Sequence, residues 1–170
     1  MSFDPDVVLI GGDIAYDDAL RACAYSWDNF YWNIENLDLL MNRTVPIVLS
    51  IGNHDVGYDA LSTSKIDKED VEKVPLFFLY NPQHFDRHSS EKKVPTFADR
   101  SSIHYHVIGN TVHLHLDSGY MLSYESQDEF IRNTSNQFGK FYKFGNYHNP
   151  IYPTCYDLDP ESVLLIDIQE

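Results

Sequence analysis

The chain has 170 residues, a length that suits one domain with a sizeable core. Apolar residues make up 43% of it, as in globular rather than disordered proteins. The formal net charge of -14 argues against nucleic acid and anionic membranes as main partners, because both require a basic surface. An anionic substrate remains compatible with this charge, since bound metal ions would reverse the sign of the local field.

Two short apolar runs, residues 7–10 and 47–51, predict strands that are buried on both faces. Between them, apolar residues recur at three- and four-residue spacing, which predicts an amphipathic helix over residues 27–41. Each predicted strand runs into a glycine and then into polar residues. In open α/β sheets, ligands bind at the carboxyl ends of the strands, so we expect chemistry in these two loops.

The rest of the chain has one clear β-hairpin and one less regular region. Residues 56 to about 100 have mixed charges and no periodicity, which predicts a long surface excursion with short helical pieces. The alternating segments 103–107 and 112–116 flank Gly109-Asn110 in a hairpin pattern. A helix over residues 126–137 and a strand over residues 141–147 are expected to follow, and the strand ends beside His148.

Targeting and modification signals are weak. The N-terminus has no basic region, and no apolar stretch approaches the ~20 residues that span a bilayer, so we expect neither a signal peptide nor a membrane segment in this chain. Cys23 and Cys155 lack metal-ligand or redox spacing, which favours buried thiols over the alternative of one disulfide. Asn42 and Asn133 each begin a glycosylation acceptor triplet, which matters only for a secreted glycoprotein.

Three polar motifs follow three of the predicted strands: GDIAY at residues 12–16, GNHD at 52–55 and HNPIYP at 148–153. Each motif alone fits a helix cap, a turn or a buried histidine. Their order and their common position at strand ends favour a single site. The set resembles the signature of the calcineurin-like metallophosphoesterase superfamily, and the tyrosine favours its purple acid phosphatase branch. The resemblance covers nearly all of residues 5–157.

The resemblance implies an α/β fold, a layered β-sandwich flanked by helices, with residues 1–170 forming a partial calcineurin-like phosphoesterase domain that is incomplete at both ends. It also implies a dinuclear metal centre of iron with zinc, manganese or a second iron. Two such ions clamp a phosphoryl group and bind the hydroxide that attacks it. The implied metal ligands are Asp13, Tyr16, Asn53 and His148, and the implied catalytic residue beside them is His54.

The implied activity is acid-phosphatase-like hydrolysis of phosphomonoesters, either phosphorylated small molecules or phosphoproteins. A phosphodiesterase on the same metal core is one alternative. A catalytically inactive remnant or isoform is the other, because the superfamily's first DxG block and last GHxH block, which both supply metal ligands, have no counterpart here. We therefore expect this chain alone to be nearly inactive. The resemblance implies secretion or lysosomal targeting if the full-length protein carries a signal peptide.

Four further histidines alternate along the predicted hairpin. With a two-residue turn at Gly109-Asn110, they form two opposed pairs on one face of the sheet. Four imidazoles on one face could bind zinc or copper, but we favour histidines that are packed or solvated there. The segment is not the missing GHxH block, because it lacks the preceding glycine. The opposed pairs are His104 with His115 and His106 with His113.

Overall fold

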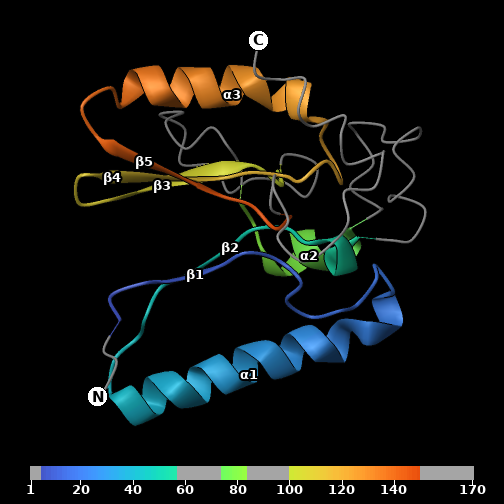
Figure 1. Ribbon diagram of the computed structural model, residues 1–170. Helices are drawn as coiled ribbons and strands as arrows, with labels where there is room; N and C mark the ends of the chain where they lie inside the picture. Colours follow the sequence, from blue (N-terminus) through green and yellow to red (C-terminus); the bar gives the residue numbers. More distant parts are fainter. Residues whose placement is uncertain (1–4, 57–73, 84–99, 150–170) are drawn as a thin grey trace, which may run out of the picture.

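The computed structural model describes residues 5–56, 74–83 and 100–149, and these form two β-sheets that are each covered by a helix (Figure 1). One sheet contains β1 (Val8–Ile10) and β2 (Ile47–Leu49), and α1 (Ala24–Met41) covers it. The other contains β3 (His104–Ile108), β4 (Thr111–His115) and β5 (Tyr142–Asn146), beneath α3 (Tyr124–Gln137). The layered α/β fold expected from the sequence is therefore confirmed.

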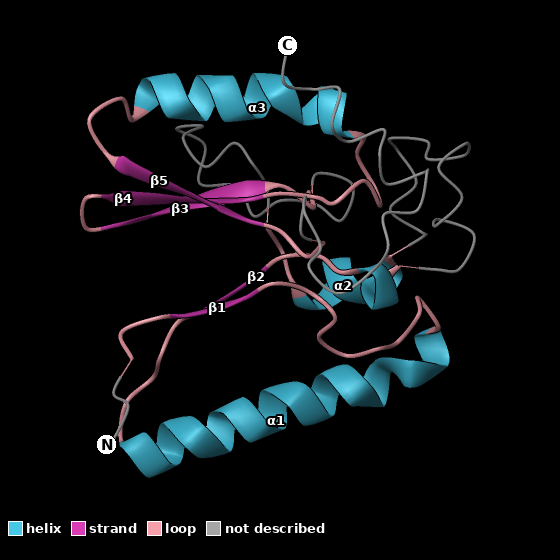
Figure 2. Cartoon of the chain, viewed as in Figure 1, coloured by secondary structure: helices cyan, strands magenta, loops and turns pink. Residues whose placement is uncertain are grey.

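The two strands of the first sheet run parallel, with Val8 opposite Ile47 and Ile10 opposite Leu49. Their carboxyl ends therefore lie side by side, as Figure 2 shows. The prediction that both strands are buried on both faces is correct for the end of β2 but wrong for β1, whose three residues are only half-buried. In the described residues β1 has a strand on one side only, so part of its surface stays open.

The predicted hairpin is confirmed in register, because β3 and β4 pair antiparallel around Gly109-Asn110. β5 pairs with β4 in parallel, so the segments after β4 and β5 leave the sheet at the same end. One face of this sheet carries Tyr105, Val112 and Leu114, which pack against apolar residues of α3 and the segment after it. The helix begins where the Ser123 hydroxyl accepts a hydrogen bond from the Ser126 amide.

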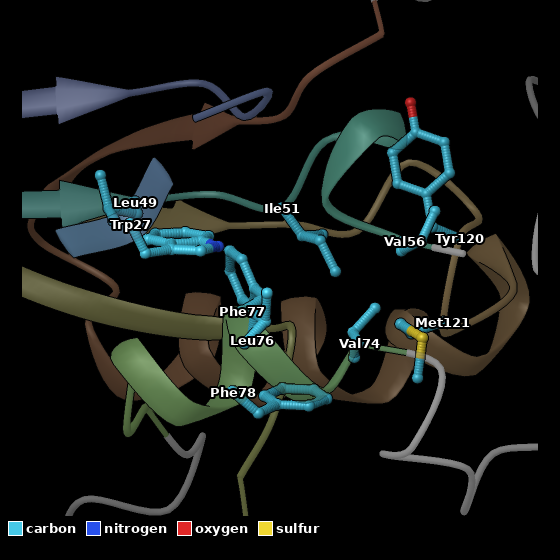
Figure 3. Close-up of a cluster of buried hydrophobic side chains, with 10 residues drawn as sticks. All are labelled: Trp27, Leu49, Ile51, Val56, Val74, Leu76, Phe77, Phe78, Tyr120 and Met121. Atoms are coloured by element: carbon cyan, nitrogen blue, oxygen red, sulfur yellow. The ribbon is translucent and has the colours of Figure 1, made fainter. Parts of the chain in front are cut away.

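The main core lies between α1, the first sheet and α2 (Pro75–Tyr80) (Figure 3). Residues 56 to about 100 were expected to form a surface excursion with short helical pieces. α2 is such a short helix, but its burial corrects the expected surface position. Leu76, Phe77 and Phe78 are almost fully buried there, because three consecutive apolar residues on a one-and-a-half-turn helix meet Trp27 and Ile51. The rest of that stretch, residues 57–73 and 84–99, lies outside the described residues.

Trp27 joins α1 to the loop after β1. It is fully buried, stacks on Tyr80 with ring centroids 5.4 Å apart, and donates a hydrogen bond from Nε1 to the buried carboxylate of Asp17. The Ala19 amide donates to the same carboxylate at 2.8 Å. Burial raises the pKa of Asp17, and the Trp27 and Ala19 bonds oppose that shift. The helix thus fixes one end of the first polar loop.

The start of α1, the state of the cysteines and the lack of a membrane-spanning helix among the described residues can also be compared with the sequence predictions. A short 3₁₀ turn (Arg21–Cys23) precedes α1, which starts three residues earlier than the apolar spacing indicated. Cys23 is a free, half-buried thiol, whereas Cys155 lies outside the described residues. Among the described helices, none combines the length and apolar character required to cross a bilayer.

Candidate metal centre

The loops that follow β1, β2 and β5 meet at one place. Parallel pairing of β1 with β2 brings Asp13 and Asn53 to the same edge, and β5 delivers His148 from the second sheet. A hydrogen bond between the Ser50 hydroxyl and Nδ1 of His115, 2.9 Å long, joins the two sheets just before this edge. The three motifs therefore become neighbours, and the contact between Gly11 and His148 joins residues 137 apart in sequence.

The imidazole of His148 faces oxygen acceptors with both of its nitrogens. Nδ1 lies 2.8 Å from the Gly11 carbonyl oxygen, so it carries a proton and donates to that oxygen. Nε2 lies 2.9 Å from the amide oxygen of Asn53 and 3.2 Å from a carboxylate oxygen of Asp13. A neutral imidazole has one N–H, so its second nitrogen presents a lone pair to two oxygens. A metal cation among these three atoms, or a second proton on the ring, removes the conflict.

The spacing of these donor atoms fits a metal ion. Adjacent ligands held about 2.1 Å from one ion lie about 3.0 to 3.4 Å apart in octahedral and tetrahedral geometries. The two separations from Nε2 of His148, 2.9 and 3.2 Å, lie at or close to this range. Donation of the other ring N–H to a backbone carbonyl is the usual support for a metal-binding histidine. Carboxylate, amide oxygen and imidazole are also suitable ligands for a divalent ion.

Close contact between two glycines brings the loops together. Gly12 has φ +103° and a Cβ there would lie 2.8 Å from the Cα of Gly52. A Cβ on Gly52 would lie 2.2 Å from the Asp13 amide nitrogen and 2.4 Å from its carboxylate. Real Cβ atoms do not approach this closely, so both positions require glycine. Asp13 itself has φ +56°, a left-handed conformation that aspartate tolerates better than most residues.

The Asp55 side chain connects the loop after β1 to the loop after β2 by hydrogen bonds. The sequence analysis did not predict this role. One carboxylate oxygen accepts from the amides of Gly52 at 2.8 Å and Asp13 at 3.1 Å, and the other from the amide of Ile14 at 3.2 Å. The side chain is fully buried, and burial raises the pKa of Asp55 to about 6 although these hydrogen bonds oppose the shift. The signal in the sequence was the acidic fourth position of GNHD.

Asp55→Asn should destabilise the fold by about 1 to 3 kcal/mol at pH 7.5, because an amide replaces one acceptor oxygen with an NH₂ group and leaves a buried backbone N–H unpaired. Urea unfolding followed by circular dichroism measures the loss. Asp128→Asn is the control, since that carboxylate forms only an exposed pair with Arg132 on α3 and should change stability by less than about 0.5 kcal/mol. Equal effects of the two substitutions would contradict the role of Asp55.

Tyr16 and His54 lie at the exposed side of the same site. Their rings stack with centroids 4.4 Å apart, and Tyr16 is 59% exposed. The negative charge of Asp13 and a hydrogen bond to it raise the pKa of Tyr16, so the phenol keeps its proton unless a cation offsets that charge. The His54 amide donates to Asp13 at 2.9 Å, which fixes the second carboxylate oxygen.

Asp18 holds the His54 side chain, and it too was missed. Its carboxylate lies 2.9 Å from Nδ1 of His54, and its own amide donates to the His54 carbonyl at 2.9 Å. Nδ1–H donation to the carboxylate leaves Nε2 as the ring atom that can exchange a proton.

Several residues of the loop after β1 have positive φ, which concentrates backbone strain at the site. They are Gly12, Asp13, Tyr16, Asp18 and Ala19.

The segment after β4 supports the third motif. The Ser118 hydroxyl accepts hydrogen bonds from the amides of His148 at 3.2 Å and Asn149 at 3.1 Å. Asp117, which is buried, shapes this segment by accepting from three successive amides, beginning with Tyr120 at 2.6 Å. Nothing in the sequence analysis pointed to this turn, because it is recognisable only once β4 and β5 are paired.

The hairpin histidines lie on one face of the second sheet, as the predicted register requires. The zinc or copper alternative gains no support, because no group of three or more His, Cys, Asp or Glu in the described residues is arranged to bind a metal ion. His104 and His115 stack with nearly parallel planes, 4.7 Å between centroids, so their in-plane lone pairs run parallel rather than converge. His113 instead stacks on Phe144. These histidines are packed, the interpretation that we favoured.

The chain belongs to the calcineurin-like phosphoesterase family, whose sequence profile matches residues 2–169. Membership establishes a metal-dependent phosphoesterase in general, from a family that uses a dinuclear metal centre. Neither the comparison with curated proteins nor the comparison with solved structures found a match.

Proposed function

We propose that this chain carries the phosphate-binding metal centre of an acid-phosphatase-like phosphomonoesterase. Asp13, Asn53 and His148 would bind metal, and Tyr16 would add a ligand at the exposed side. The observation that carries the proposal is the environment of His148, whose two ring nitrogens both face oxygen atoms. A metal ion would accept lone pairs from all three atoms at once: Nε2 of His148, the amide oxygen of Asn53 and the carboxylate oxygen of Asp13.

The ligand types favour a dinuclear centre of the kind the sequence indicated. Asp13 would contribute a ligand from either carboxylate oxygen, because one oxygen faces His148 and the other accepts from the His54 amide. The phenol of Tyr16, whose pKa is raised by Asp13, becomes an anionic ligand only beside a strong Lewis acid such as ferric iron. Zinc, manganese or a second iron suits the side of Asn53 and His148.

In the reaction that we propose, the metal ions and the protein side chains have different roles. When bound, the metal ions would supply Lewis-acid activation of the phosphoryl group. His54 would hold a proton at Nε2 and give it to the leaving oxygen, because Asp18 fixes its Nδ1 and the ring stays 40% exposed at the site. The exposed side of the site, formed by Tyr16 and His54, would admit phosphorylated small molecules or a phosphoprotein.

Metal titration with two-dimensional imidazole NMR tests the assignment. At pH 7.5, addition of Zn²⁺ or Mn²⁺ should perturb the ring signals of His148 first. His148→Ala or Asn53→Ala should weaken metal binding at least about 100-fold, because loss of a ligand has a larger effect than the 10- to 100-fold loss caused by mutating a residue that hydrogen-bonds to a ligand. His113→Ala is the matched control, because this half-buried histidine lies on the hairpin and stacks on Phe144. Unchanged affinity in the His148 variant would refute the site.

Substrate class is tested separately with p-nitrophenyl phosphate and bis(p-nitrophenyl) phosphate on the metal-loaded chain. Because this chain alone is expected to be nearly inactive, we expect low turnover, with the monoester hydrolysed faster than the diester at equal concentration. His54→Ala should remove the remaining activity while metal binding remains. Faster hydrolysis of the diester would establish the phosphodiesterase alternative. Metal binding without hydrolysis of either ester would favour the inactive remnant or isoform.

A further inference from the structure

Tyr120 places its ring beside His148 of the candidate metal centre, and its buried hydroxyl group has no hydrogen-bond partner among the described residues. The residue is 6% exposed, and its hydroxyl oxygen is inaccessible to solvent and unpaired. Leaving such a group unpaired is unfavourable, so native proteins usually provide a partner, a water or a ligand. A buried hydroxyl that no described residue pairs with indicates a position where a bound ligand would accept its hydrogen.

The orientation of Tyr120 is set by the turn after β4. Its backbone amide donates to Asp117, and its ring lies 6.3 Å from the ring of His148, between centroids. In Figure 3 the hydroxyl points away from Met121 and the rest of the apolar cluster to which its ring belongs. The apolar edge of the ring therefore packs in the core while the oxygen is turned out of it.

We propose that the Tyr120 hydroxyl donates a hydrogen bond to an oxygen of the phosphoryl group that the centre binds. This inference rests on the proposed function and adds a substrate-binding residue to it. A phenol is a suitable donor to an anionic phosphate oxygen, because hydrogen bonds to charged acceptors are stronger than neutral ones. Tyr120 lies in the segment that follows β4, so phosphate binding would depend on this segment as well as on the loops after β1 and β2.

The position of the Tyr120 hydroxyl favours a donor role over a role as metal ligand. The oxygen is buried, whereas Tyr16 is 59% exposed at the open side of the site. A neutral phenol has one hydrogen to donate, and a bound phosphate oxygen would accept it. Tyr16, with its open position, is the better candidate for a metal-binding phenolate.

Isothermal titration of inorganic phosphate into the Zn²⁺- or Mn²⁺-loaded chain tests the proposal. Tyr120→Phe removes only the oxygen atom and should weaken phosphate binding about 10- to 100-fold, the range for one hydrogen bond to a charged group. The metal affinity of the variant should stay the same. In the metal-free chain, its urea midpoint should be equal to or higher than that of the wild type, because the unpaired buried hydroxyl has been removed.

Tyr124→Phe is the matched control. Its hydroxyl already donates to the Ser118 carbonyl at 2.9 Å in the same segment, so the substitution should leave phosphate affinity unchanged. Equal phosphate affinity of wild type and Tyr120→Phe would overturn the inference and leave the metal assignment intact. A loss of metal affinity in Tyr120→Phe, or a lowered urea midpoint, would overturn it in favour of a ligand or a structural role. A wild-type chain that binds neither metal would refute the proposed function and this inference together.

Discussion

Gly52→Ala is expected to destroy the candidate site. The new Cβ would lie 2.2 Å from the amide nitrogen of Asp13 and 2.4 Å from its carboxylate, and both neighbours are held by hydrogen bonds to Asp55 and His54. Because backbone rather than a flexible side chain must move, we expect a loss of about 3 kcal/mol of stability. Displacement of Asp13 should also weaken Zn²⁺ or Mn²⁺ binding about 100-fold. Urea unfolding and metal titration measure the two effects.

The control for this substitution is Gly139→Ala. A Cβ at that position would meet only the Asn136 carbonyl oxygen at 3.6 Å, an ordinary contact, and Gly139 lies beyond the end of α3. A compatible Gly-to-Ala change leaves stability unchanged or raises it slightly by restricting the unfolded chain. Gly12→Ala should repeat the Gly52 result, since its Cβ would reach Gly52 and His148 within 2.9 Å. Normal metal binding by either site variant would contradict the close approach of the loops.

Trp27→Ala is expected to cost about 4 kcal/mol of stability, a large part of the roughly 5 to 15 kcal/mol typical of a domain. The indole is fully buried, packs against Tyr80, Tyr31 and Phe77, and donates to the buried Asp17 carboxylate. Its removal leaves both a cavity and a buried charge with a lost hydrogen bond. Urea unfolding at pH 7.5 gives the value directly.

Two variants separate these causes. Trp27→Phe retains an aromatic ring but removes the N–H donor, so it should cost about 1 to 3 kcal/mol, the penalty for an unpaired buried acceptor. Trp32→Ala is the control on the same helix, because that indole is 61% exposed and its loss should change stability by less than about 0.5 kcal/mol. Similar losses at Trp27 and Trp32 would show that α1 does not anchor the loop through Asp17.

The sequence predicted local elements well where periodicity was strong. The hairpin register is confirmed because alternation and a two-residue turn leave one pairing that keeps Tyr105, Val112 and Leu114 on the same face. Short helical pieces were expected in this region, but the position of α2 and its burial were missed, because six residues that are almost all apolar have no measurable period. The half-burial of β1 was missed because a run of apolar residues cannot reveal how many strands flank it.

Some residues of the candidate site could be predicted from the sequence, and others could not. Asp13, Asn53 and His148 were expected to meet because each follows a strand, and the structure brings their side chains together. Their role as metal ligands, which the family resemblance implied, stays a prediction. Asp55, Asp18 and Tyr120 were not found. Asp55 and Asp18 act by hydrogen bonds to groups 36 to 42 residues away, and spacing along the chain has no information about such pairs.

The sequence by itself determined the layered fold, the family motifs and the residue types available at the centre. Only the tertiary structure decided that both nitrogens of His148 face oxygen atoms and that two glycine backbones touch. It also decided that the Tyr120 hydroxyl is buried without a partner in the part of the chain that the structure describes. The physical reason is that strand and helix patterns depend on neighbours within a few residues, whereas hydrogen-bond partners and desolvation depend on which segments fold side by side.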